Sequence, residues 1–220
     1  MHGILFDFNG TMVFDGEFHK EAWDVFSKKY RGYAMPEEEM ARAHGQTNKQ
    51  IIRMLLGDSL TDQESERLSK DKEALYRECC LQHKDEYQLV DGLEQLLDTL
   101  YKKGVPMTIC SASIQDNITF FIEYFQLDRW FDKKHIIYDD GTHHDKISMF
   151  QKGAKCINTP ITDCIVFEDS YSGIHFAHKC NVYKIIGVNT PDHTMNEESV
   201  HEIAFAINNY KEINIEKIFD

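Results

Sequence analysis

The hydrophobic positions of this chain follow two different periods, and the change between them predicts its organisation. An apolar run at 4–6 is followed at 7–11 by three polar residues, a phenylalanine and a glycine, as in a buried strand that stops abruptly. Apolar residues then recur at spacings of three and four from Phe14 to Tyr30, which is the period of an amphipathic helix. We expect helices and no strand up to about residue 88.

Beyond residue 88 short apolar runs alternate with helical stretches. The expected strands cover 105–110, 135–138, 163–167 and 183–188, and the expected helices cover 92–103, 116–125, 147–157 and 172–179. The tail predicts a helix over about 197–208 and a weak final strand. Strands that alternate with helices are typical of βαβ units, so we predict an α/β fold with a parallel sheet covered on both faces.

Three of the predicted strands end in polar side chains. These are Asp7, Ser111 and the pair Glu168 and Asp169. The ends of parallel strands meet at one edge of a sheet, and carboxylates gathered there repel one another unless a cation lies between them. Hard oxygen ligands suit Mg²⁺. With Ser111 and Lys146 as phosphate contacts, the pattern predicts an Mg²⁺ site for phosphoryl transfer.

Composition narrows the classes of function. With 28% charged residues and a net charge of −13, the chain looks soluble and globular, and we expect no nucleic-acid partner because no basic stripe is present to neutralise phosphates. The chain has no run of about 18 apolar residues and no basic n-region, so we expect no membrane span and no signal peptide. Its six cysteines show no CxxC spacing, which favours reduced thiols in a cytoplasmic protein.

The order of these motifs resembles the haloacid dehalogenase-like superfamily of phosphotransferases, in the branch that includes β-phosphoglucomutase. Residues 7–11, Asp-Phe-Asn-Gly-Thr, are similar to the family's first motif, Asp-x-Asp-Gly-Thr. Ser111 matches the second motif, Lys146 the third, and Glu168 with Asp169 the fourth. The similarity covers nearly the whole chain.

The resemblance implies a fold and a division into domains. Residues 1–13 and 89–220 would form a Rossmann-like three-layer core, and residues 14–88 an α-helical cap inserted after the first motif. In such enzymes the cap closes over the substrate and excludes water. Because core and cap can bury their own apolar faces, we expect a monomer.

The resemblance also implies roles for individual residues. Asp7 would attack phosphorus and form an aspartyl-phosphate, while Ser111 and Lys146 would bind the transferring phosphoryl group. The implied Mg²⁺ ligands are Asp7, the main-chain carbonyl of Asn9 and Asp169, with Glu168 nearby through water. The implied substrate-binding residues are Thr11, His19, Trp23, His44, Gly45, Thr47, Asn48, Ser113 and Asn117.

One departure from the family pattern concerns catalysis. Where the family has its second aspartate, the general acid/base, this chain has Asn9. An amide makes hydrogen bonds but does not exchange a proton near neutral pH, and general acid–base catalysis is worth about 10²–10⁴-fold. Three explanations stay open: an engineered change, a natural substitution whose role passes to another group, and a protein of reduced activity.

Two other departures concern phosphate binding. Lys146 is followed by Ile147 and Ser148 instead of the family's prolines. The cap turn has His44 and Asn48 where the mutase branch has basic residues that grip a distal phosphate. Loss of an arginine removes a bidentate phosphate clamp, which favours a phosphatase over a mutase.

The leading prediction is therefore an Mg²⁺-dependent phosphatase of a small phosphorylated metabolite, such as a sugar phosphate. One alternative is a β-phosphoglucomutase-like mutase. Another is a phospho-ligand binder with little or no catalysis, which Asn9 motivates. A third is hydrolysis of a carbon–phosphorus bond, which requires a Schiff base on a cap lysine.

Overall fold

The computed structural model describes residues 2–43, 46–143, 145–195 and 201–220. The chain divides into two compact units. We call Met1–Phe14 with Gln88–Asp220 the sheet unit, and Asp15–Tyr87 the helical unit. No described helix is both long and apolar enough to cross a lipid bilayer.

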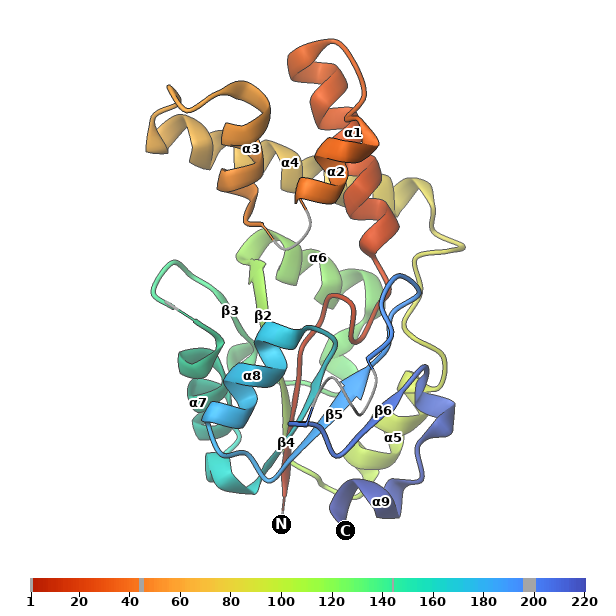
Figure 1. The fold of residues 1–220 in the computed structure, drawn as a ribbon. Helices are drawn as coiled ribbons and strands as arrows, with labels where there is room; N and C mark the ends of the chain where they lie inside the picture. The colour runs from red at the N-terminus through yellow and green to blue at the C-terminus, as the bar shows by residue number, and fades with distance from the viewer. Residues whose placement is uncertain (1, 44–45, 144, 196–200) are drawn as a thin grey trace. The chain divides into compact units, whose positions relative to one another are not determined.

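The described strands of the sheet unit form one parallel sheet in the order β3-β2-β1-β4-β5-β6 (Figure 1). They are β1 (Gly3–Phe6), β2 (Met107–Ile114), β3 (Ile137–Asp139), β4 (Cys164–Glu168), β5 (Lys184–Val188) and β6 (Phe205–Ile207). β1 lies inside the sheet, where Leu5 pairs with Thr108 of β2 and Val166 of β4. The arrangement confirms the predicted α/β fold with a parallel sheet.

Helices cover both faces of this sheet (Figure 1). The α-helices are α5 (Leu93–Lys102), α6 (Gln115–Phe125), α7 (Lys146–Cys156), α8 (Tyr171–Lys179) and α9 (Ile215–Phe219), and the short 3-10 helices are η1 (Leu127–Arg129), η2 (Lys133–His135), η3 (Ile161–Asp163) and η4 (Tyr210–Glu212). α7 and α8 pack on the face that carries Leu5 and Val166. On the other face Phe6 contacts Phe131, and Phe8, just after β1, stacks on Phe121 of α6 with ring centroids 4.0 Å apart.

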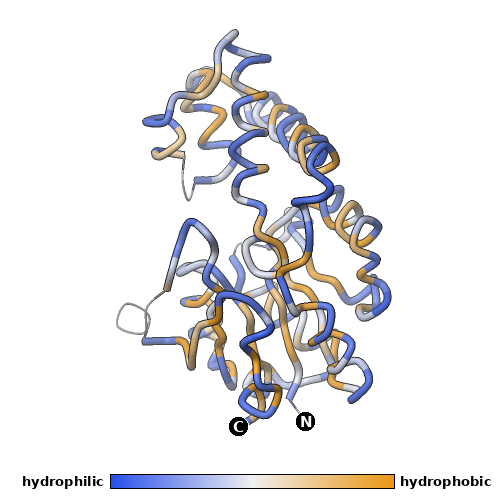
Figure 2. The backbone as a smooth tube through the Cα atoms, turned by 90° about the vertical axis from the view of Figure 1, so that its right-hand side faces the viewer, coloured by the Kyte–Doolittle hydropathy of each residue, from blue (hydrophilic) through white to orange (hydrophobic). Residues whose placement is uncertain are grey.

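The helical unit contains α1 (Gly16–Arg31), α2 (Glu37–Ala43), α3 (Asn48–Leu56) and α4 (Asp62–Gln82). Their ends follow local sequence signals: Thr61 and Glu64 form a capping box before α4, and Gly32 ends α1 in the left-handed conformation. The helices bury a shared apolar cluster that includes Phe26 and Ile52. In Figure 2 the helices of this unit alternate between hydrophilic and hydrophobic colours, as amphipathic helices do.

The segment before the helical unit and the segment after it lie side by side in the sheet unit. Val13 forms an antiparallel bridge with Leu89, and the Val90 amide donates to the Met12 carbonyl at 2.9 Å. The Gly10 amide donates to the Val13 carbonyl at 2.8 Å. The turn that follows β1 is therefore tied to both segments.

The tail of the chain differs from its prediction. Residues 205–207 form the strand β6, which pairs in parallel with β5, where a helix over 197–208 was expected. The edge of β5 presents backbone groups that need partners, and pairing with them outweighs a local helical pattern. The end of the chain forms the helix α9 instead of the expected strand. Residues 197–200 of the expected helix lie outside the described residues.

Helix α7 approaches the sheet closely at Gly153, so we predict that Gly153→Ala destabilises the protein. An added Cβ would clash with the Cys110 sulfur and lie 3.4 Å from Leu5. Overpacking costs about 1–3 kcal/mol, whereas the gain in helix propensity is only about 1 kcal/mol, so we expect a net loss on the order of 1 kcal/mol in urea unfolding. Gln151→Ala, on the exposed side of α7, should change stability by less than about 0.5 kcal/mol. Equal stability of the two variants would contradict the prediction.

Candidate active site

Three carboxylates meet at the carboxyl edge of the sheet. Asp7 directly follows β1, Glu168 is the last residue of β4, and Asp169 follows it. The strands are neighbours, with Phe6 paired to Phe167, so the register itself brings the carboxylates together. One oxygen of each lies within 4.8 Å of the others. Asp7 is 4% exposed and Glu168 is fully buried, so solvent screens their repulsion poorly.

Lys146 supplies a positive charge to this cluster. It is the first residue of α7, and its Nζ donates to Asp7 Oδ1 at 2.7 Å and also to Glu168 Oε1. The Asp145 side chain caps the helix by accepting from the Ser148 amide, which fixes where α7 begins. The structure therefore places the predicted lysine at the predicted carboxylates without the family's prolines.

Small residues let the backbone come close to these carboxylates. Gly10 has a φ of 74°, and a Cβ there would overlap the Asp169 carboxylate. A Cβ on Gly173, in the first turn of α8, would overlap the Glu168 carboxylate. The Ser170 amide and hydroxyl donate to Glu168 Oε2 at 2.8 and 2.9 Å. Local sequence thus holds Glu168 firmly and leaves space for Asp169.

Burial and mutual repulsion change the acidity of the cluster. Burial raises the pKa of the Asp7 carboxyl to about 7; Glu168 adds to the increase and Lys146 opposes it. Burial, followed by Glu168 and Asp7, also raises the pKa of Asp169. Burial alone would lower the pKa of Lys146, but the two carboxylates outweigh burial and raise it. When all four groups are ionised, two negative charges remain unbalanced.

The donor set fits a magnesium ion. The three buried or partly buried carboxylates offer hard oxygen ligands in one place, and a divalent cation would balance the remaining charge. The residues that would hold it are Asp7 and Asp169, with Glu168 beside them and the Asn9 main-chain carbonyl in the same turn.

Side chains from β2 meet the turn after β1. Ser113 Oγ donates to Asn9 Oδ1 at 2.6 Å, and Ser111 Oγ lies 3.5 Å from the same oxygen. β2 extends to Ile114, beyond its predicted end at residue 110, with a register shift between Cys110 and Ile114. Ser111 is therefore inside the strand rather than after it, because β2 pairs with β3 again at Ile114, beyond the register shift.

Thr11 and Asn117 complete the predicted residues of the sheet unit. The Thr11 hydroxyl donates to Asp169 Oδ1 at 3.2 Å and lies 3.5 Å from Asp7 Oδ2. Thr11 is fully buried among these groups. Asn117 is 2% exposed on α6.

The other predicted substrate-binding residues belong to the helical unit. His19 and Trp23 lie on α1, while Thr47 is the cap of α3 and Asn48 its first residue. His44 and Gly45 lie outside the described residues. The side-chain amide of Asn48 donates from Nδ2 to Glu73 Oε1 at 2.6 Å.

Sequence reasoning missed Lys72, a buried cation that joins these candidates. It is 1% exposed, and its Nζ lies 2.9 Å from Glu73 Oε1 and 2.6 Å from His19 Nδ1. Its Nζ also lies 5.3 Å from the centre of the Trp23 ring. Lys72 stands four residues after Leu68, and both are buried on the same face of α4. Residues four apart lie on one face of a helix, so this spacing could have indicated that Lys72 is buried.

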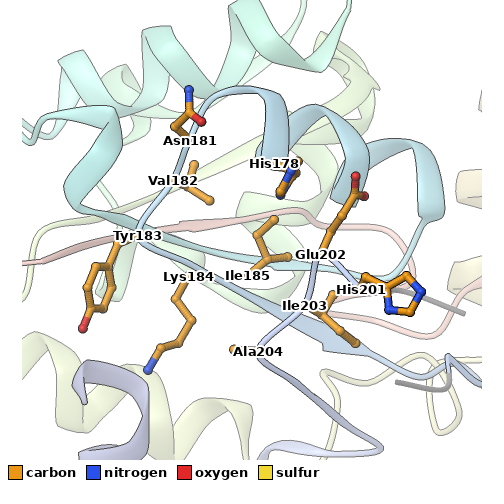
Figure 3. A pocket seen from close by; sticks show the side chains of 10 residues that line it. All are labelled: His178, Asn181, Val182, Tyr183, Lys184, Ile185, His201, Glu202, Ile203 and Ala204. Atoms are coloured by element: carbon orange, nitrogen blue, oxygen red, sulfur yellow. The ribbon is translucent and has the colours of Figure 1, made fainter. Parts of the chain in front are cut away.

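A surface cavity of about 430 Å³ lies away from this edge of the sheet (Figure 3). It is lined by residues at the end of α8, the start of β5 and the segment before β6, including His178, Tyr183, Lys184 and Ile203. None of the described strand-end carboxylates lines it.

Comparison with known proteins agrees with the motif order. A family model described as haloacid dehalogenase-like hydrolase matches residues 4–188. The chain belongs to this family. A haloacid dehalogenase-like (HAD) hydrolase of family IA, variant 3, from Entamoeba histolytica is 34% identical, with a TM-score of 0.91 over 100% of this chain and 98% of that one. The resemblance seen in the sequence is confirmed.

Two further proteins are similar to this chain at lower sequence identity. β-Phosphoglucomutase from Clostridium difficile is 20% identical, with a TM-score of 0.77 over 99% of this chain and 95% of that one. The chloroplastic 5-amino-6-(5-phospho-D-ribitylamino)uracil phosphatase of Arabidopsis thaliana is 22% identical over 179 residues. The match covers 80% of this chain and 47% of that protein, so the chain spans about half the length of this relative.

The raised pKa of Asp7 predicts how metal and pH act on stability. The pKa of about 7 in the folded protein exceeds the unfolded value of about 3.9. Between about pH 4 and pH 7 the metal-free folded state therefore binds more protons, and its stability falls as pH rises. We expect a melting temperature in EDTA that falls between about pH 5 and pH 8. Mg²⁺ at about 100 times its Kd should add about 2.7 kcal/mol to the free energy of unfolding. The increase in melting temperature with Mg²⁺ should be larger at about pH 8 than at about pH 5.

Asp169→Asn provides the control for this experiment. It removes one repelling carboxylate, so it should raise the melting temperature in EDTA and lose most of the shift with Mg²⁺. Equal Mg²⁺ shifts at both pH values and in the variant would mean that the cluster does not bind the ion.

Proposed function

We propose that the protein is an Mg²⁺-dependent phosphatase of a small phosphorylated metabolite, a sugar phosphate being the expected class, and that it acts through an aspartyl-phosphate on Asp7. Family membership supports phosphoryl transfer on phosphorylated substrates, and the Arabidopsis relative is itself named a phosphatase. The observation that carries the proposal is the placement of Asp7, which shares a buried cluster with two further carboxylates and the Lys146 ammonium.

The first step transfers the phosphoryl group to Asp7. A carboxylate oxygen of Asp7 forms a bond to phosphorus while the ester P–O bond breaks, and the leaving oxygen departs with the electron pair and takes up a proton. Lys146 and Ser111 would bind the phosphoryl oxygens and hold the group in line with Asp7. Mg²⁺, when bound, would neutralise charge on the phosphoryl oxygens and on the carboxylates.

The second step releases phosphate. Water attacks phosphorus, the bond to Asp7 breaks, and the carboxylate is regenerated together with inorganic phosphate. In both steps a proton must move at the position of Asn9. The Asn9 side chain is held by Ser113, so it can orient a substrate oxygen or a water but cannot exchange a proton. We propose that protons then pass to and from solvent, which makes turnover slow.

The second candidate function is a phospho-ligand binder with little or no turnover. Asn9 is the specific observation that favours it, because the amide preserves hydrogen bonding while removing the acid/base group. A β-phosphoglucomutase-like mutase has weaker support, since the similarity to that enzyme at 20% identity concerns the fold.

We also propose that the protein acts as a monomer in the cytoplasm. All six cysteines are free thiols, which supports a reducing compartment. Size-exclusion chromatography with light scattering would test the monomer.

Phosphate release from a panel of sugar phosphates and other small esters tests the proposed function. We expect slow Mg²⁺-dependent release by the wild type, none by Asp7→Ala, and a rate raised about 100-fold or more by Asn9→Asp. Asp58→Ala, an exposed aspartate of the helical unit, is the matched control and should keep the wild-type rate. Mass spectrometry of acid-quenched protein should find phosphate on the peptide that contains Asp7.

The same experiment separates the two candidate functions. An inert wild type with an active Asn9→Asp variant would identify a binder. Activity that survives Asp7→Ala would remove Asp7 as the nucleophile.

A further inference from the structure

We propose that Tyr210 is a positioning residue for the candidate active site and that it acts through Thr11. The proposal rests on the proposed function, because it concerns the same cluster of carboxylates. It adds a residue from the C-terminal part of the chain, outside the motifs that carry the family resemblance.

The Tyr210 side chain reaches the turn after β1. Its hydroxyl donates to the Thr11 carbonyl at 3.1 Å. Tyr210 is 3% exposed and Thr11 is fully buried, so water is not available to replace this hydrogen bond. The Tyr210 ring also lies 5.7 Å, centre to centre, from Phe167, the residue before Glu168.

Thr11 connects this hydrogen bond to the carboxylates. Its hydroxyl donates to Asp169 Oδ1 at 3.2 Å and lies 3.5 Å from Asp7 Oδ2. The Thr11 amide donates to the Phe8 carbonyl at 3.2 Å. Thr11 is thus held at its amide, its carbonyl and its side chain, and its hydroxyl position depends on all three.

Tyr210 is itself fixed by the sheet unit. It is the first residue of η4, three residues after the last residue of β6, and its amide donates to the Asp91 carbonyl at 2.8 Å. Gly92 has a φ of 84°, and a Cβ there would lie 2.5 Å from the Lys211 amide nitrogen. The 91–92 segment and η4 are therefore packed backbone to backbone, which gives the tyrosine ring a rigid support.

Removal of the hydroxyl would leave the Thr11 carbonyl buried without this donor. The turn would then relax, and the Thr11 hydroxyl would move relative to Asp7 and Asp169. Groups that orient metal ligands from outside typically contribute about 10–100-fold to metal affinity or activity. The expected consequence is weaker binding of Mg²⁺.

Calorimetric titration with Mg²⁺ alone, on the full chain, tests the inference. We expect Tyr210→Phe to raise the Kd for Mg²⁺ about tenfold. Tyr183→Phe is the matched control, because its hydroxyl donates to the Asp220 carbonyl at 3.1 Å in the same part of the chain but is exposed. The control should bind Mg²⁺ within about twofold of wild type. Wild-type affinity in Tyr210→Phe would overturn the inference.

A double-mutant cycle distinguishes positioning from a general structural role. If Tyr210 acts through the Thr11 hydroxyl, then Tyr210→Phe should change the Kd by less than about twofold in a Thr11→Val background. The same loss in both backgrounds would show that Tyr210 acts on the fold and would overturn the proposed route.

The outcomes also separate this inference from the proposed function. A wild type that binds Mg²⁺ but releases no phosphate removes the proposed phosphatase and leaves the Tyr210 inference to be decided by its own variants. A wild type that binds no Mg²⁺ removes the metal site on which both depend.

Discussion

The candidate active site depends on holding three carboxylates close together where water cannot screen them. Asp7, Glu168 and Asp169 share one edge of the sheet, and Lys146 balances only part of their charge. The repulsion that remains makes the metal-free cluster unfavourable, and burial makes it more so. The same repulsion provides the driving force for binding a divalent cation.

Much of the surrounding structure can be understood as a response to this constraint. The pairing of β1 with β4 brings two of the carboxylates together, and the start of α7 places an ammonium against them. Gly10 and Gly173 leave room for carboxylate oxygens that any side chain would displace. Ser170 donates twice to Glu168, which keeps that carboxylate from turning away. These features come from three separate segments of the chain, and each satisfies a local requirement of the same charge cluster.

The strand-end residues were predictable because a parallel sheet brings its carboxyl ends to one edge wherever they lie in the sequence. Tyr210 and Lys72 were not predictable in this way. Tyr210 contacts a residue 199 positions away, and Lys72 contacts His19, 53 positions away, so no local period reports either pair. The tail was predicted wrongly for a related reason, since β6 exists through its pairing with β5. Local sequence determines how a segment prefers to fold, but partners at long range decide among the available choices.

The bridge between Val13 and Leu89 closes the sheet unit at the point where the helical unit is inserted. No described residue between them takes part in the pairing of β1 with β2 and β4. A different insert of any length could therefore occupy the same position while the carboxylate cluster stayed intact. Val13 lies six residues after Asp7, so any such insert would begin close to the carboxylate cluster in the sequence. The insertion point thus separates the part of the chain that builds the carboxylate cluster from a part that folds as a compact unit of its own.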